Sequence, residues 1–369
     1  MEMRGIQAAH GLLSSEIETA IRAVFEHGRF IGGPEVAELE DKLAAYAGVP
    51  YCATCGNGTD ALSLILAAMD IGPGDAVFLP GYTFFATAEA VLAAGAQPVL
   101  VDVRACDANM DPLALSAAIE HHTGGTPRAI IGVDLFGQSA DWPAITGIAE
   151  RYGLRVIEDA AQSMGGQLDF ARCGSFGDAA AVSFFPSKPL GGIGDGGAVL
   201  THDEDIAGRV RLLKNHGRDG GKYHHIAVGR NSRLDSIPEA LLLTKLPHLD
   251  AWVGICEAAA RRYKKLLPEA VIPLTIADNA RSAWAQYVVT LPSEEVRDTV
   301  RAELKLRQIP HDIYYPIALS EQPILKNFGA SLPVAERLSR ATLALPIHPF
   351  IALEEQLEVT DAIRLGLSY

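Results

Sequence analysis

The sequence has few cysteines, fewer basic than acidic residues and no long apolar run, and each shortage excludes a class of protein. Five cysteines in 369 residues are an odd number, which argues for reduced thiols rather than a disulfide framework. Asp and Glu number 45 against 31 Lys and Arg, so we expect no nucleic-acid partner. No window approaches 18 consecutive apolar residues and no signal peptide is evident, so we expect a cytoplasmic protein without a membrane partner.

Apolar residues are plentiful, at 49% of the chain, and their spacing alternates between strand and helix patterns. Alternation with short links predicts an α/β fold with a large, mostly parallel sheet covered on both faces. The pattern changes after about residue 246. We therefore expect a large domain over residues 1–246, opened by an amphipathic helix at 14–27, and a small C-terminal α+β domain over residues 247–369.

The segment from residue 155 to residue 201 holds the strongest chemical signal. One apolar strand pattern ends in the carboxylate Asp159, and a second apolar run leads Lys188 into a turn rich in Gly and Pro. Burying an ammonium group is costly unless its pKa falls, and a lowered pKa makes an amine a nucleophile. In pyridoxal 5'-phosphate (PLP) enzymes a lysine binds the cofactor and an aspartate holds the pyridine nitrogen protonated. The pair predicts a PLP site; the alternative is a surface lysine and a helix-capping aspartate.

Three other motifs admit different chemistry. Residues 192–197 have the spacing G-x-G-x-x-G, but a strand pattern follows where a dinucleotide site requires a helix. Cys52 and Cys55 form a C-x-x-C without a second pair at metal spacing, so we interpret them as packing residues. His216, His224 and His225 have no acidic neighbour at ligand spacing on a helix, so we expect no metal.

Six segments identify a family. They read IGGPEVAELEDKLAAYAGV, GNGTDALSL, PGYTFFATAEAV, VIEDAAQSMGG, SFFPSKPLGGIGDGGAV and GRNSRLD. Through them the chain resembles the DegT/DnrJ/EryC1/StrS aminotransferases, PLP enzymes that aminate keto sugars carried on nucleotides. The resemblance covers nearly the whole chain and weakens after about Leu246. It implies the PLP-dependent transferase fold of the aspartate aminotransferase type (fold type I), PLP and its pyridoxamine form as cofactor, and glutamate as amino donor.

The resemblance also implies which residues hold the cofactor, namely Gly58, Thr59, Phe84, Gln162, Ser183 and Asn231 beside Asp159 and Lys188. Gly58 and Thr59 would form the phosphate cup, where a strand-to-helix turn exposes N–H groups. Phe84 would stack on the ring, with core packing as the alternative. Gln162 would bond the ring hydroxyl, unless it merely caps a helix.

Two positions bear on assembly and on the chain beyond the motif. Asn231 would reach the PLP phosphate from the neighbouring subunit, as Ser183 does from its own, so the resemblance implies a homodimer with shared sites. Where the family commonly has Gln-Ala after this motif, the chain has Pro238 and Glu239, which leaves the start of the next helix open.

The substrate is predicted from three segments, GRDGGKYHHIAVGRNSRLDS, FFPSKPLGG and YYPIAL. They are most similar to the branch that aminates C3 of UDP-2-acetamido-2-deoxy-3-oxo-glucuronate for surface polysaccharides. A uronate carboxylate calls for a cation, and Arg233 is the first candidate. His224, Tyr314 and Tyr315 are further candidate contacts, although Tyr314 stands where that branch is expected to have histidine.

Other functions stay open at this point. The enzyme could aminate a dTDP- or GDP-linked sugar with a 3-keto or 4-keto group. Relatives that dehydrate nucleotide sugars have histidine in place of the lysine, so Lys188 disfavours that reaction. A regulatory protein that binds PLP without turnover is the remaining alternative.

Overall fold

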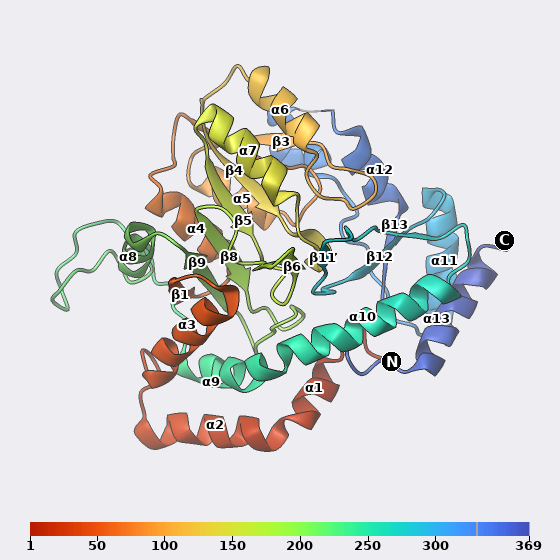
Figure 1. Ribbon diagram of the computed structural model, residues 1–369, viewed down its shortest axis with the longest axis horizontal. Coiled ribbons are helices and arrows are strands. Elements are labelled where there is room, and N and C mark those ends of the chain that lie inside the picture. The colour runs from red at the N-terminus through yellow and green to blue at the C-terminus, as the bar shows by residue number, and fades with distance from the viewer. Residues whose placement is uncertain (330, 369) are drawn as a thin grey trace.

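The computed structural model describes residues 1–329 and 331–368, and its largest element is a seven-stranded sheet (Figure 1). In spatial order the strands are β1 (Tyr51–Cys55), β9 (Gly197–Thr201), β8 (Ala179–Ser183), β5 (Arg155–Asp159), β4 (Thr126–Val133), β2 (Asp75–Pro80) and β3 (Gln97–Val101). Strand β9 runs antiparallel to both of its neighbours, and the other pairs are parallel. The predicted mostly parallel sheet of an α/β fold is therefore confirmed.

Helices cover the two faces of this sheet because its strands are apolar on both sides. Val77 and Leu79 of β2 pack in one core with α4 (Gly58–Ala68) and α5 (Ala86–Ala93), whereas Phe78 packs in another with α6 (Pro112–Glu120) and α7 (Trp142–Tyr152). The helices α3 (Pro34–Ala47) and α8 (Glu204–Leu213) lie toward the β1 end (Figure 1).

The C-terminal part follows a long helical run. Helix α9 (Ser236–Lys245) continues through the 3-10 turn η2 (Leu246–His248) into α10 (Leu249–Leu266), so our proposed domain boundary at residues 246 and 247 falls within this run. A three-stranded antiparallel sheet follows, made of β10 (Ile272–Pro273), β12 (Tyr287–Thr290) and β13 (Thr342–Leu345). Helices α11 (Glu294–Leu306) and α13 (Leu353–Gly366) share a core with this sheet. Helix α12 (Pro333–Ala341) and the 3-10 turns η3 (Leu319–Glu321) and η4 (Pro323–Phe328) belong to the core cluster of the large sheet.

A small third sheet and the N-terminal helices join the two regions. The sheet pairs β11 (Ala280–Arg281) with β6 (Gln167–Leu168) and β7 (Ala171–Arg172). The amphipathic helix expected at residues 14–27 is α2 (Ser14–His27), which packs along α9. Helix α1 (Ile6–Leu12) was not predicted; Ala9 of α1 packs on Trp252 of α10.

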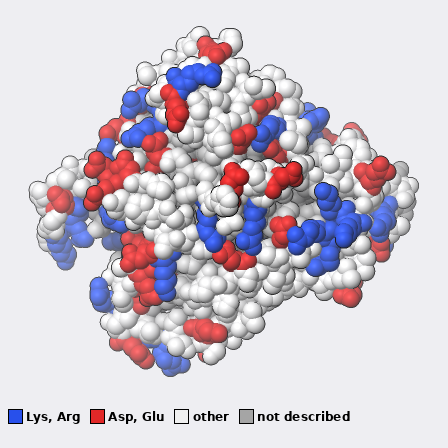
Figure 2. Space-filling model, in the orientation of Figure 1, with Lys and Arg blue, Asp and Glu red and all other residues white. Residues whose placement is uncertain are grey.

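The composition led us to expect no membrane-spanning helix and no basic face for nucleic acid. No helix in residues 1–329 or 331–368 combines the length and apolar character needed to cross a bilayer. On the face in Figure 2, acidic and basic side chains lie among one another, and basic side chains gather where α10 meets α13.

Candidate active site

Asp159 ends β5 in the middle of the large sheet and is only 6% exposed. Its Oδ2 accepts a hydrogen bond from Thr87 Oγ1 at 2.8 Å, and its Oδ1 accepts one from the Ala161 N–H at 3.2 Å. Burial raises the pKa of the Asp159 carboxyl, while these two donors and the nearby charge of Lys188 act in the opposite direction. A carboxylate in this position can hold a positive charge strongly because little water screens it.

Lys188 lies in the turn that follows β8, next to β5 in the sheet. The backbone N–H of Lys188 donates to the carbonyl of Phe185 at 2.9 Å. The turn is tight, because a Cβ on Gly191 would lie 2.2 Å from the carbonyl oxygen of Pro186. Burial lowers the pKa of the Lys188 amine to about 8, and the charge of Arg4 lowers it further, against the opposing pull of Asp159. The structure thus brings the predicted lysine and aspartate within electrostatic reach of each other.

The predicted phosphate turn lies at the same edge of the sheet. Asn57 caps α4, accepting the Asp60 N–H at 2.8 Å, so the helix begins at Gly58 and Thr59. The first N–H groups of a helix have no partner within it, which suits an anion. A Cβ on Gly58 would lie 2.9 Å from Cβ of Ser183, the last residue of β8. A larger residue than glycine would therefore clash where α4 begins against β8.

Gln162 lies between two partners rather than at a helix end. Its Oε1 accepts the Phe136 N–H at 2.6 Å, and its Nε2 donates to the Tyr315 hydroxyl at 2.9 Å. The ring of Tyr315 lies 5.9 Å from that of Phe84, which is 55% exposed and so is not a core residue. Tyr315 thus links an exposed aromatic side chain to a buried amide, and an exposed aromatic face can stack on a flat ring. Tyr314 is half-buried and packs edge-on against Tyr315.

The polar segment near residues 214–235 is anchored to the start of α4. Ser232 Oγ donates to Asp60 Oδ2 at 2.7 Å, while the neighbouring Asn231 side chain is exposed. Arg233 is half-buried, and its Nη1 donates weakly to Asn215 Oδ1 at 3.4 Å. In the described residues no hydrogen bond or ion pair joins Asn231, Arg233 or His224 to the lysine and aspartate.

Histidine contacts in this segment are to the backbone. The exposed rings of His224 and His225 pair through Nδ1 with the carbonyls of Asp219 and His216, at 3.1 and 2.9 Å. These contacts fold the loop on itself. They leave the second ring nitrogen of each histidine exposed to solvent or to a ligand.

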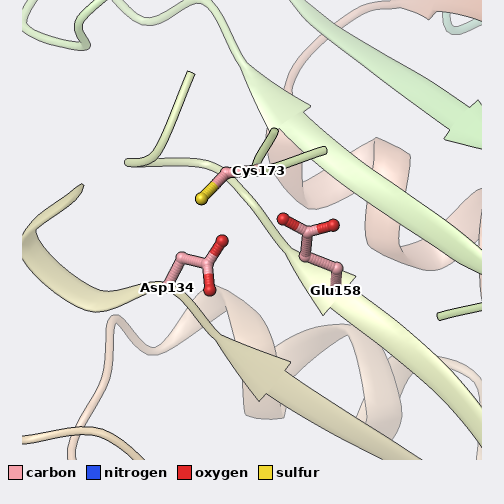
Figure 3. A group of neighbouring side chains, drawn as sticks. All are labelled: Asp134, Glu158 and Cys173. Atoms are coloured by element: carbon pink, nitrogen blue, oxygen red, sulfur yellow. The ribbon is translucent and has the colours of Figure 1, made fainter. Parts of the chain in front are cut away.

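One cluster has the residue types of a metal site. Asp134, Glu158 and Cys173 are buried with their ligand atoms within 4.8 Å of one another (Figure 3). All four carboxylate oxygens accept hydrogen bonds, from Ala140, Trp142, Ser163, Gly174 and Phe176. Burial and the adjacent Asp134 raise the pKa of Glu158 well above its usual range, and burial raises that of Cys173. Because these donors already occupy the carboxylate oxygens, we interpret the cluster as a hydrogen-bonded support next to Asp159 rather than a metal site.

The sequence did not point to three residues that complete the site. Thr87 bonds Asp159, Tyr82 accepts the Tyr315 N–H at 3.1 Å, and Arg4 lies near Lys188. Thr87 and Tyr82 fall inside the segment PGYTFFATAEAV, in which the sequence suggested a role only for the adjacent aromatic residues Phe84 and Phe85. No local pattern in the first residues indicates a role for Arg4, because its hydrogen-bond partners lie far along the sequence.

Comparisons with known proteins identify the same family that the sequence motifs resemble. The model of the DegT/DnrJ/EryC1/StrS aminotransferase family matches residues 12–364. The UDP-2-acetamido-2-deoxy-3-oxo-D-glucuronate aminotransferase of Pseudomonas aeruginosa is 43% identical over 340 residues, 92% of each chain. The crystal structure of a DegT DnrJ EryC1 StrS aminotransferase from Brucella abortus superposes with a TM-score of 0.96 at 42% identity over all of both chains. NtdA from Bacillus subtilis, solved with bound cofactor PMP, gives 0.88 at 29% identity, over 96% of this chain and 82% of that one.

Proposed function

The chain belongs to the DegT/DnrJ/EryC1/StrS aminotransferase family, and we propose that it aminates C3 of UDP-2-acetamido-2-deoxy-3-oxo-glucuronate. Membership makes it a sugar aminotransferase that uses pyridoxal 5'-phosphate, as the sequence predicted. The observation that carries the reaction type is the pairing of a low-pKa amine, Lys188, with the buried carboxylate of Asp159 at the carboxyl ends of the central strands.

The residues at this edge fit the cofactor by their chemistry. Bound PLP supplies a ring that takes up the electron pair released when an amino group moves between donor and acceptor. Asp159 would hold the proton on the ring nitrogen. The α4 N-terminus at Gly58 and Thr59, with Ser183, would bind the phosphate. Lys188 would bind the cofactor and then carry a proton to and from the reacting carbon.

Two side chains would orient the ring. Phe84 offers an exposed aromatic face, and Gln162 offers an amide already fixed by the Phe136 N–H. A ring placed between them would be held flat, with its hydroxyl near the amide. Thr87 would keep the Asp159 carboxylate turned toward the ring through its 2.8 Å hydrogen bond.

The choice of sugar is supported by the relative from Pseudomonas aeruginosa, whose name states a 3-oxo-glucuronate. We propose that Arg233 pairs with the uronate carboxylate, because it is half-buried and its bond to Asn215 is long at 3.4 Å. His224, Tyr314 and Tyr315 are the further proposed contacts. A tyrosine at position 314 lengthens the side chain where the resemblance to that branch implies histidine.

We also propose that glutamate is the amino donor and that the enzyme is a homodimer with shared sites. Support for the dimer comes from Asn231, whose exposed amide could serve a neighbouring subunit, and from exposed apolar residues of the N-terminal region such as Phe25 and Ile31. The five cysteines are all unpaired thiols, which supports a reducing, cytoplasmic location.

The role of Lys188 is tested by Lys188→Ala. We expect the variant to lose covalent attachment of the cofactor, measured by mass spectrometry of the borohydride-treated protein, and to lose turnover. Thermal melting should stay near that of the unaltered chain, because a costly buried ammonium is removed. The matched control is Lys326→Ala, an exposed lysine of η4, which should change neither readout. Turnover retained by Lys188→Ala would reject the assignment.

The acceptor is tested with the pyridoxamine-loaded enzyme and a panel of nucleotide sugars. UDP-linked 3-oxo-glucuronate should be aminated, and Arg233→Lys should raise the KM for this uronate more than for a neutral 3-keto sugar. Amination confined to C4 of dTDP- or GDP-linked sugars would overturn the substrate assignment. Cofactor binding with no amination of any sugar would favour a regulatory role.

A further inference from the structure

An arginine near the N-terminus contacts the turn that carries Lys188. Arg4 Nε donates to the carbonyl of Ser187 at 3.0 Å, and its Nη1 donates to the carbonyls of Trp284 and Ile347 at 3.1 and 3.0 Å. The three acceptors come from the lysine turn, from the segment before β12 and from the segment after β13. One guanidinium therefore joins the residue immediately before Lys188 to two parts of the C-terminal region.

The backbone on both sides of Arg4 is fixed as well. The Ile347 N–H donates to the carbonyl of Met3 at 3.3 Å, and the His348 ring lies 3.1 Å from the carbonyl of Glu2. Gly5 has a φ of +61°, and a Cβ there would lie 2.8 Å from the His348 ring. Glycine is needed at this position on both counts. The contacts of Glu2, Met3 and Gly5 with the segment around His348 thus fix the location of Arg4.

Arg4 also places a fixed charge beside the amine. A small cavity is lined by Arg4, Lys188 and Lys245, with no Asp or Glu among the described residues that line it. Titratable groups nearby include Asp159, whose charge opposes the lowering of the Lys188 pKa, and Cys256 in the cavity wall. Tyr314 and His348 interact electrostatically with Arg4, and His10 does so with Lys245. Burial raises the pKa of the Cys256 thiol to about 11, so it adds no charge near neutral pH.

Lys245 is the second buried amine of this cavity. Its Nζ donates to the Gly191 carbonyl, and burial lowers its pKa to about 8. Arginine, in contrast, stays protonated throughout the physiological range. Arg4 is therefore the permanent cation of the group, and a like charge favours the neutral form of a neighbouring amine.

We propose that Arg4 is a positioning residue for Lys188, holding the lysine turn through the Ser187 carbonyl and keeping a fixed positive charge beside the amine. The proposal deepens the function proposed above and rests on it for what Lys188 does in the reaction. The state of the amine can nevertheless be measured in the full chain without cofactor or sugar. A failure of either proposal is therefore distinguishable from a failure of the other.

The test is pulsed acetylation of the cofactor-free chain from pH 6 to 10, with labelling of Lys188 followed by mass spectrometry. An amine with a pKa of about 8 is roughly one-quarter neutral at pH 7.5, against about one part in a thousand for an ordinary lysine. Arg4→Gln should move the Lys188 profile to higher pH and slow its labelling at pH 7.5 by about two- to tenfold. An unchanged profile in a folded Arg4→Gln chain would overturn the proposal.

Two further variants separate charge from general structure. Arg4→Lys places an amine in the same buried position, where its charge is not permanent, and it cannot bridge three carbonyls. It should therefore restore the labelling rate only in part, while amide exchange at Ser187, Lys188 and Leu190 stays faster than in the unaltered chain. If Arg4→Gln does not fold, unchanged labelling and unchanged exchange in Arg4→Lys would reject the proposal. Arg22→Gln removes an exposed cation of the neighbouring helix α2 and should leave the Lys188 profile as it is.

Discussion

Glu239 gives a prediction whose size follows from the structure. Its side chain is fully buried in the first turn of α9, and its Oε2 has no partner among the described residues. Thr54 Oγ1 lies 3.0 Å from Glu239 Oε1 and 3.2 Å from Glu40 Oε1, which also accepts from Lys214 Nζ at 3.0 Å. The Thr54 hydroxyl has one proton and can donate it to only one of these two carboxyl groups. If it donates to Glu40, a protonated Glu239 that donates to Thr54 completes the chain of hydrogen bonds.

The pKa of Glu239 agrees with this arrangement. Burial, aided by the charge of Glu40, raises it from 4.5 to about 8. In the unfolded chain the carboxyl ionises near 4.5, so between pH 4.5 and 8 unfolding releases a proton and the free energy of unfolding falls as pH rises. Each pH unit is worth about 1.4 kcal/mol, which sets a ceiling of about 5 kcal/mol over this window. Relaxation around the buried charge should reduce the observed loss to about 2–4 kcal/mol.

Glu239→Gln keeps the shape and the donor of the neutral acid but cannot ionise. We expect the variant and the unaltered chain to have similar free energies of unfolding at pH 5, and the variant to be more stable by about 2–4 kcal/mol at pH 8.5. Urea denaturation at both pH values, followed by circular dichroism, measures the difference. Glu18→Gln, an exposed site on α2, is the control and should show no such divergence. The reasoning would be refuted if the free energies of unfolding of Glu239→Gln and the unaltered chain differed by the same amount at both pH values.

Two further predictions concern the cofactor site. Asp159→Asn should lower kcat by roughly 100- to 1,000-fold with little change in melting temperature, because the amide has nearly the shape of the carboxyl but cannot stabilise a protonated ring; normal turnover would contradict the role given to Asp159. Gly58→Ala should weaken retention of PLP during dialysis by about tenfold, since its Cβ would meet Ser183 at 2.9 Å and displace the α4 N-terminus. Gly147→Ala, where no atom lies within 4 Å of the added Cβ, is the control and should retain PLP normally.

Local patterns in the sequence predicted the elements and the central pair. The strands before Asp159 and Lys188 are continuous apolar runs, and the helices around them repeat apolar residues at helical spacing, so each element could be located from its own residues. The shortest strands, such as β6, β7 and β11, were missed because two residues carry no periodicity. Helix α1 was missed because it contributes only Ala9 to a core.

The sequence by itself determined most strands and helices of the large sheet region, the family and the predicted lysine and aspartate pair, because these depend on runs of neighbouring residues. Only the tertiary structure decided which groups surround them. Thr87 meets Asp159 across 72 residues, Gln162 meets Tyr315 across 153, and Arg4 meets Ser187 across 183. Such partners are selected by the packing of whole elements against one another. Their influence on the charge of a buried amine or acid depends on distances of a few ångströms, which no local pattern encodes.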